Sequence, residues 1–215
     1  MPPPHPPQQQ PQLNGSLMMS DGESSSEDED IPFAGMLAHT AQICPLVRAP
    51  RSVLRKGLRL ARVGSDDVVL DLGCGDGRVL VEAAKLGARA IGIDVNPWCL
   101  KQARAAAAKA IDSAGSPLSE RIEVLEHDLA DLPSLPRYPD ATVVYVYLYP
   151  KAISKVMLTL QQAVDDGKRV VIYCTSGCSA SPGNLISGRA QTAEGHLGML
   201  RLYEKGSSGD DVSLS

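Results

Sequence analysis

The sequence predicts an α/β protein, built on a doubly wound, mostly parallel sheet with a C-terminal antiparallel hairpin. Three observations predict it. From residue 50 onward helical and strand patterns alternate, the connections between them are short, and a glycine-rich turn follows the first strand. A parallel sheet with helices on both faces accommodates this order. Ligands of such sheets bind at the carboxyl ends of the strands, so we expect the chemistry just after Leu72, Ile93, Leu125 and Leu148.

Each element is predicted from apolar spacing and from residues typical of helix ends. Pro50 suits a first helical position, Gly87 closes the second helix, and Asn96 caps the third, which Pro97 opens. Gly195 lies at the turn of the hairpin. In chain order we predict helix 50–62, strand 68–72, helix 79–86, strand 90–94, helix 97–111, strand 122–125, strand 142–148, a helix through 153–164, strand 169–174, and hairpin strands 184–191 and 197–204.

Length and composition indicate one globular domain with a tail. Of the 215 residues, 43% are apolar and 21% are charged. Residues 1–44 are Pro/Gln-rich and then acidic, with little to offset the entropy of ordering, so we predict a disordered tail. The domain is expected over 45–205, and a flexible C-terminus over 206–215.

Charge and cysteine content exclude several classes of protein. Residues 1–47 carry six acidic and no basic side chains, which leaves 21 basic and 19 acidic residues in the rest and argues against nucleic acid as a partner. No apolar run of about 18 residues and no leader pattern occurs, so no transmembrane segment is expected. The five cysteines and four histidines lack the spacing of a disulfide framework or a metal site. We therefore expect reduced thiols and a cytoplasmic protein, with nuclear or mitochondrial placement left open.

The turn after the first strand carries glycines at Gly73, Gly75 and Gly77, flanked by Asp71 and Asp76. Glycine permits tight turns and close approach of a ligand to the backbone. A dinucleotide-binding loop has GxGxxG spacing and takes a pyrophosphate, whereas this loop is GxGxG and carries two carboxylates. The pattern predicts a ligand with an ammonium group.

Further carboxylates follow the next two strands. Asp94 ends the second strand, 19 positions after Gly75, where a carboxylate can accept both hydroxyls of a ribose. Asp128 follows the third strand and can accept an adenine amino group, while Leu129 can cover the ring. We count Asn96 with these cofactor-binding residues. An adenosine that bears an amino acid fits all of these groups, and S-adenosylmethionine is such a molecule.

With these motifs the sequence resembles the class I, seven-strand S-adenosylmethionine-dependent methyltransferases, which have a Rossmann-like fold. VVLDLGCGDGR resembles their first motif, AIGIDVNP their second, and HDL their adenine-contacting motif, within residues 45–175. Asn96-Pro97-Trp98 and Tyr147-Leu148-Tyr149-Pro150 are similar to the small lysine methyltransferases of the adenine nucleotide translocase and the ATP synthase c-subunit. Two departures are Leu46 and Ala49, in place of aromatic and hydroxyl residues, and the missing membrane-anchoring segment of the animal members.

The resemblance implies a protein substrate whose lysine ε-amino group accepts the methyl group. Tyr147 and Tyr149 are the candidates to line an acceptor channel, because aromatic walls can hold a methylated ammonium by cation–π attraction. No Asn/Asp-Pro-Pro-aromatic motif stands here, which argues against adenine or glutamine as acceptor. A small-molecule N- or O-methyltransferase, a non-catalytic cofactor-binding scaffold and a nicotinamide-dependent oxidoreductase are the alternatives.

The first predicted helix carries a cluster of cations. Two interpretations stay open: a solvated face, or a surface that docks an acidic partner or a lipid membrane. The residues are Arg51, Arg55, Lys56, Arg59 and Arg62.

Overall fold

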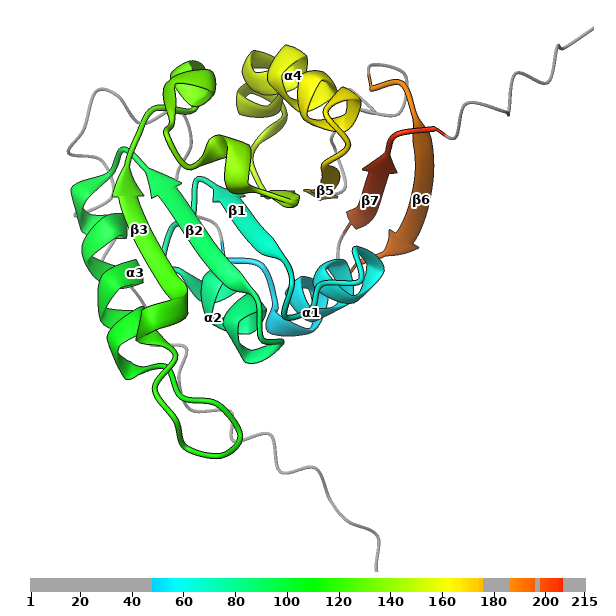
Figure 1. The fold of residues 1–215 in the computed structure, drawn as a ribbon. Coiled ribbons are helices and arrows are strands. Elements are labelled where there is room, and N and C mark those ends of the chain that lie inside the picture. Colours follow the sequence, from blue (N-terminus) through cyan, green and yellow to red (C-terminus); the bar gives the residue numbers. More distant parts are fainter. Residues whose placement is uncertain (1–47, 176–185, 196–197, 207–215) are drawn as a thin grey trace, which may run out of the picture. The chain divides into compact units, whose positions relative to one another are not determined.

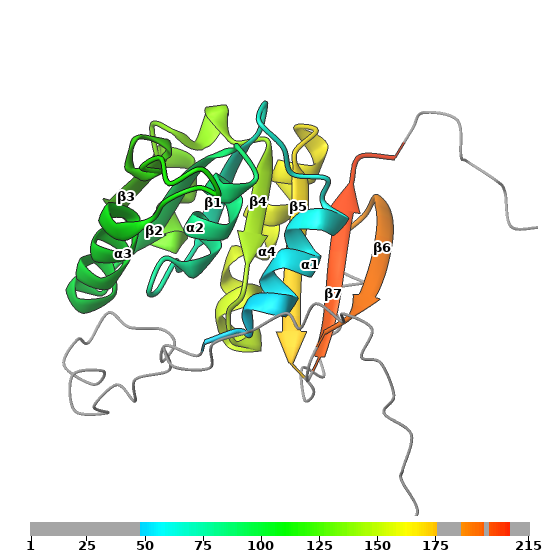
Figure 2. The same ribbon diagram turned by 90° about the horizontal axis from the view of Figure 1, so that it is seen from below.

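A computed structural model describes residues 48–175, 186–195 and 198–206. Seven strands form one sheet in the order β3-β2-β1-β4-β5-β7-β6, and Figure 2 shows this order from β3 on the left to β6 on the right. The strands are β1 (Val68–Leu72), β2 (Arg89–Asp94), β3 (Ile122–Glu126), β4 (Val143–Val146), β5 (Arg169–Thr175), β6 (Arg189–Glu194) and β7 (Gly198–Glu204). β1 to β5 pair in parallel, and β7 pairs antiparallel with both β5 and β6. The predicted fold class is confirmed.

Helices cover both faces of the sheet (Figure 1). One core cluster joins the sheet to helices on one side, and a second joins it to the other side. Successive residues of β1 face opposite sides of the sheet, because Val69 lies in one cluster and Leu70 lies in the other. The first side holds α1 (Arg51–Leu60), α2 (Arg78–Lys85) and α3 (Pro97–Lys109), and the second holds α4 (Pro150–Asp165) and the short 3-10 helix η3 (Leu129–Ser134).

The predicted elements are all present, with corrections at their ends. Pro50 is the N-cap of α1, one position before the first helical residue. α3 ends at Lys109, and Ile111 instead forms an isolated bridge with Pro117. The fourth strand was predicted over residues 142–148 but is Val143–Val146, because its neighbour β1 ends at Leu72, opposite Val146, and then turns into the glycine-rich loop.

The hairpin is confirmed, and its first described strand begins at residue 189. Its second strand, β7, is the one that joins the sheet beside β5, with Val171 opposite Leu202. The predicted tail 1–44, the positions 45–47 with Leu46, and all but residue 206 of the predicted C-terminus lie outside the described residues.

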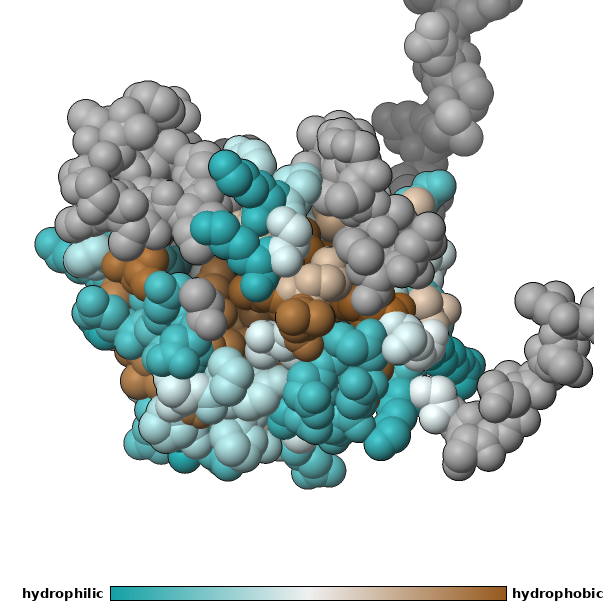
Figure 3. All heavy atoms as spheres, turned by 90° about the horizontal axis from the view of Figure 1, so that it is seen from above, coloured by the Kyte–Doolittle hydropathy of each residue, from teal (hydrophilic) through white to brown (hydrophobic). Residues whose placement is uncertain are grey.

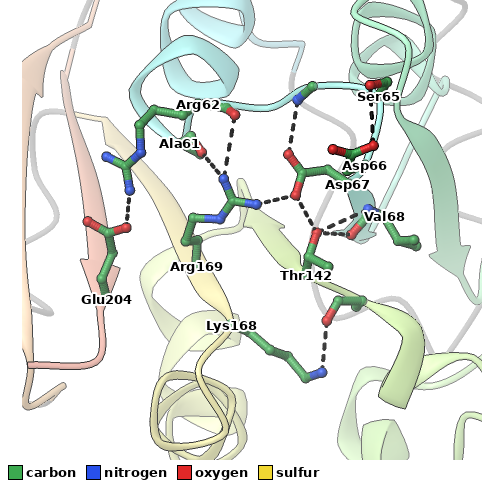
Figure 4. A network of polar contacts seen from close by, with 12 residues as sticks. Ala61, Arg62, Ser65, Asp66, Asp67, Val68, Thr142, Lys168, Arg169 and Glu204 are labelled. Atoms are coloured by element: carbon green, nitrogen blue, oxygen red, sulfur yellow. Dashed lines mark hydrogen bonds and ion pairs between the residues drawn. The ribbon is translucent and has the colours of Figure 1, made fainter.

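A polar network fixes the edge of the sheet where β1 and β5 begin (Figure 4). Asp67 accepts hydrogen bonds from the Gly64 N–H at 2.9 Å and the Thr142 hydroxyl at 2.7 Å, and it forms an ion pair with Arg169. Arg169 also donates to the carbonyl of Ala61. The side chain of Asp67 thus ties α1, β1, β4 and β5 together at the edge opposite the glycine-rich loop.

Most cations of α1 have partners within the chain. Arg51 and Arg55 form ion pairs with Glu82 of α2, at 3.1 and 2.7 Å. Lys56 donates to the carbonyl of Glu194, and Arg62 pairs with Glu204. These contacts account for much of the cationic cluster, and a docking role for it stays a prediction. None of the described helices combines the length and the apolar character needed to cross a membrane.

Candidate functional site

The glycine-rich loop joins β1 to α2 in a conformation that needs glycine. Gly73 and Gly77 have φ of 75° and 79°, in the left-handed region. A Cβ on Gly73 would lie 2.8 Å from Cδ2 of Leu148, and one on Gly77 would lie 2.9 Å from the Cα of Ala103 in α3. The N–H groups of Gly73 and Cys74 both donate to the carbonyl of Ile93, at 2.9 Å. The loop is therefore packed against β2, α3 and the chain after β4.

Asp94 connects the end of β2 to this loop. Its Oδ2 accepts a hydrogen bond from the Gly75 N–H at 3.1 Å, and its Oδ1 accepts one from the Asn96 N–H at 2.9 Å. Asn96 is buried and caps α3, accepting from the Trp98 N–H at 2.9 Å. The structure thus brings together Gly75, Asp94 and Asn96, which we predicted to bind one ligand. Asp94 and Asn96 also have structural roles, because Asp94 holds the loop and Asn96 caps α3.

Asp71 is a buried carboxyl directly below the loop. Burial raises its pKa to about 8, and the neighbouring carboxylates of Asp94 and Asp76 act in the same direction. An ionised carboxylate in this position is costly without a cation beside it. Asp71 is therefore suited to receive an ammonium group.

Asp76 differs from Asp71 in having cations beside it. Its carboxylate pairs with Arg48 at 3.0 Å and with Arg78 at 2.8 Å. We predicted that both carboxylates of the loop attract the ligand's ammonium group. Because two guanidinium groups pair with Asp76, Asp71 is the carboxyl of the loop for which the described residues provide no ion pair.

The residues after β3 lie beside the same edge. The His127 N–H donates to the carbonyl of Asp94 at 3.1 Å, which places the following turn next to β2. Asp128 is exposed, whereas Leu129 is 9% exposed and packs in the core beneath α4. The contact of Asp128 with an adenine stays a prediction, and much of Leu129 is already covered by the protein.

The predicted acceptor residues occupy two different settings. Tyr147 follows β4 and stacks on Tyr173 of β5, with ring centroids 4.8 Å apart and an interplanar angle of 33°. Tyr149 is the N-cap of α4 and is 43% exposed. Neither residue lies in β4, which ends at Val146, although Tyr147 falls within the strand predicted over residues 142–148. Tyr149 is thus the more accessible of the two.

The side of the molecule that carries α4 and η3 exposes apolar surface. These elements lie uppermost in Figure 1, and Figure 3 looks down on them, with a band of hydrophobic residues across the middle and hydrophilic residues around it. Leu158 of α4 is 87% exposed. A surface of this kind is suited to contact with another molecule.

Sequence reasoning missed Arg48, Arg78 and Tyr173. Arg78 occupies the position where a dinucleotide-binding loop has its third glycine, and this was the available signal. Tyr173 had no signal of its own, because only the register of the folded sheet, with Tyr145 opposite Val171, places it beside Tyr147. Arg48 is distant in sequence from the loop and had no signal of its own.

The arrangement can hold a nucleoside that bears an amino acid. Gly73 and Gly77 give the loop its left-handed turns and its close packing on Leu148 and Ala103, and the buried carboxyl of Asp71 can pair with a cation. Asp94 lies within reach of the same loop. The described residues contain no cluster of three or more His, Cys, Asp or Glu side chains that could hold a metal ion.

Comparison with known proteins agrees with this geometry. Residues 71–175 match the family described as the ANTKMT methyltransferase domain. A protein-lysine N-methyltransferase of Saccharolobus islandicus is 30% identical over 131 residues, which are 60% of this chain and 75% of the relative. A lysine N-methyltransferase of the ATP synthase c-subunit, from Xenopus laevis, is 37% identical over 60 residues, 28% of this chain and 26% of that protein.

A solved structure supports the fold and the ligand. The RNA methyltransferase of Salinibacter ruber, in complex with S-adenosyl-L-homocysteine, superposes with a TM-score of 0.60 and 26% sequence identity. The match covers 79% of this chain and 98% of that one.

Proposed function

This chain belongs to the family of S-adenosylmethionine-dependent methyltransferases with the ANTKMT domain, and from that premise we propose that it methylates the ε-amino group of a lysine in a protein substrate. The observation that carries the proposal is the similarity to the Saccharolobus islandicus protein-lysine N-methyltransferase, which extends over three quarters of that relative. Membership in this family excludes two of the alternative functions, the nicotinamide-dependent oxidoreductase and the non-catalytic cofactor-binding scaffold.

Each residue around the loop has a role in this proposal. Asp71 holds the ammonium group of the cofactor, Asp94 its ribose hydroxyls and Asp128 the adenine amino group. S-adenosylmethionine supplies an electrophilic methyl group on a sulfonium. The left-handed backbone at Gly73 and Gly77 forms the tight turn on which the amino-acid part of the cofactor would lie. The chain's own contribution is to hold these parts in place, since positioning alone can supply much of the rate.

The acceptor lysine has to lose a proton before it can attack. Its ordinary pKa is about 10.4, and a wall that excludes water from the channel lowers that pKa by disfavouring the charged form. In this proposal Tyr149 provides the exposed part of such a wall, and Tyr147 the part that is held by Tyr173. The same rings would hold the methylated product by cation–π attraction.

We place this activity in the cytoplasm. Cys74 and Cys99 are buried free thiols, which is typical of a reducing compartment. A protein partner is part of the proposal, and a nucleic acid partner is not.

Mass spectrometry of lysine methylation tests the acceptor. Knockout cells are complemented with wild type or with Asp94→Ala, and a lysine that is methylated only with wild type is the expected result. Purified enzyme should then methylate that protein in a knockout extract with radiolabelled S-adenosylmethionine. Unchanged lysine methylation, together with a methylated metabolite that depends on wild type, would establish the small-molecule alternative instead.

A further inference from the structure

The outward face of α4 carries two lysines and a leucine in one row. Lys151, Lys155 and Leu158 follow one another at spacings of four and three residues, which places them on one side of the helix. The opposite side of α4, with Val156 and Leu160, is buried in the core. All three residues of this α4 row are exposed. At 87%, Leu158 is the most exposed large apolar side chain in the described part of the chain.

The two lysines of the α4 row are unpaired. Within the described ranges, neither Lys151 nor Lys155 has an ion pair or hydrogen bond through its side chain. α4 contains no acidic residue before Asp165, its last residue. The cations of α1, in contrast, mostly bind side chains or carbonyls of the same chain. The α4 row therefore presents positive charge and an apolar side chain that are both available to a second molecule.

The α4 row begins beside the proposed acceptor channel. Tyr149, the exposed N-cap of α4, stands two residues before Lys151. Because a helix rises about 1.5 Å per residue, Lys155 lies about 9 Å and Leu158 about 14 Å along the helix from Tyr149. α4 lies uppermost in Figure 1, on the side where Figure 3 shows hydrophobic residues among hydrophilic ones. A protein that extends along α4 from a lysine at Tyr149 would cover the row.

We propose that the α4 row docks the substrate protein, through a segment that carries acidic side chains and one apolar side chain near the acceptor lysine. This inference rests on the proposed function, because it assigns the partner that supplies the lysine. The acids pair with Lys151 and Lys155, and the apolar side chain covers Leu158. An extended segment spans about 3.3 Å per residue, so the acids are expected about one to three positions and the apolar residue about four positions from the acceptor.

Charge complementarity and Leu158 together favour this occupant. Opposite charges at the rim of an interface guide association and suppress wrong partners. A nucleic acid offers phosphates to the lysines, but its backbone offers no apolar partner to Leu158. The chain's own acidic residues within 21–30 would compete with a substrate for the row. In that case charge reversal of the lysines would raise methylation, whereas docking of the substrate predicts that methylation falls.

Charge reversal tests the proposal in knockout cells complemented with wild type or a variant. The test variant is Lys151→Glu/Lys155→Glu. The matched control is Arg89→Glu/Lys109→Glu, which reverses two exposed cations at the start of β2 and the end of α3. Mass spectrometry measures the lysine whose methylation depends on wild type, and only the test variant should lower its methylation. Both variants should bind S-adenosylhomocysteine as wild type does, which shows that they are folded.

Kinetics with the purified substrate protein measures the size of the effect. The KM of Lys151→Glu/Lys155→Glu should rise about 10-fold, because two attractive pairs become repulsive, while kcat stays unchanged. Replacing the acids near the methylated lysine of the substrate by arginine should restore methylation by this variant and weaken it with wild type. Leu158→Ser should also raise the KM, without a loss of stability, because this side chain is exposed.

The outcomes separate the docking surface from the proposed function. Methylation of the protein lysine by Lys151→Glu/Lys155→Glu at the wild-type level or above it overturns the docking surface and leaves the proposed function in place. An equal loss in the control variant also overturns the docking surface, because it shows that only net charge matters. A methyl group that depends on wild type but lies on a nucleic acid, with no protein lysine methylated, overturns both.

Discussion

The carboxylate of Asp94 accepts a hydrogen bond from the backbone N–H of Gly75, with 3.1 Å between Oδ2 and N. This contact joins the last residue of β2 to the middle of the loop that follows β1. The other oxygen, Oδ1, accepts from the N–H of Asn96 at the start of α3. The residue proposed to hold the ribose thus also shapes the loop that receives the amino-acid part of the cofactor.

Asp94→Ala should weaken cofactor binding by about 1.5–3 kcal/mol, because it removes a charged acceptor from both the ribose and the loop. Asp94→Asn keeps an acceptor oxygen and should lose less. Calorimetry with S-adenosylhomocysteine measures both. Asp66→Asn, an exposed aspartate at the opposite edge of the sheet, is the control and should bind as wild type does. Wild-type affinity in a folded Asp94→Ala protein would show that the ribose assignment is wrong.

Cofactor binding near pH 7 should release a proton from Asp71. Burial raises the pKa of this carboxyl to about 8, so the ligand-free protein holds a proton there. An ammonium group beside it favours the ionised form, and affinity should rise with pH between about 6 and 8. Binding enthalpies in two buffers of different ionisation enthalpy give the number of protons released. Asp71→Asn should bind more weakly and should release none from this position.

The same raised pKa affects the stability of the ligand-free protein. Asp71 holds its proton more tightly when folded than when unfolded, so its contribution is fully present below pH 3.8 and is lost as pH rises to about 8. Asp71→Asn has no such carboxyl. Urea unfolding should therefore show that the variant gains stability relative to wild type between about pH 5 and pH 8. A difference that is independent of pH would contradict the assignment.

The fold could be predicted because apolar spacing and helix caps are local signals. The contact of Asp76 with Arg48 could not be predicted, because Arg48 is 28 residues away in the sequence and only the fold brings it to the loop. The end of β4 was predicted two residues too late, since an apolar run does not show at which residue the pairing with β1 and β5 stops. Asp71, Asp94 and Gly75 were found because each lies at or near the carboxyl end of a strand of a parallel sheet, where such residues meet.

Gly77→Ala should destabilise the protein more than Gly73→Ala. Both positions are left-handed, which costs about 1–2 kcal/mol for alanine. The new Cβ at Gly77 would meet the backbone of α3 at Ala103, which has little freedom to move, whereas the one at Gly73 would meet the flexible end of Leu148. Urea unfolding of the two variants compares them. Leu148→Ala should restore part of the stability lost in Gly73→Ala and none of that lost in Gly77→Ala.

Tyr149→Ala and Tyr147→Ala should separate substrate binding from stability. Tyr149 is 43% exposed, so its removal should cost little stability but should raise the KM for the protein substrate. Tyr147 packs on Tyr173, and its removal should also lower the free energy of unfolding, by about 0.5–1.5 kcal/mol for the lost ring contact alone. Steady-state kinetics and urea unfolding measure the two effects. An unchanged KM in Tyr149→Ala would remove this residue from the acceptor channel.

Glu82→Gln should destabilise the protein near neutral pH by about 1–3 kcal/mol, because a carboxyl that is 4% exposed would lose its charge between Arg51, Arg55 and Lys85. Burial opposes ionisation of Glu82, but these cations prevail and hold its pKa below the ordinary value.

Because the pKa of Glu82 is lowered in the folded protein, the stabilisation that it provides depends on pH in one direction. The contribution of Glu82 is present above the ordinary pKa of 4.5 and is lost as pH falls through the lower pKa of the folded protein. The stability gap between wild type and Glu82→Gln should therefore narrow in acid. Glu120→Gln, at an exposed position without a described ion pair, should show no gap at either pH. A gap for Glu82→Gln that persists unchanged in acid would mean that packing, and not the ion pairs, joins α1 to α2.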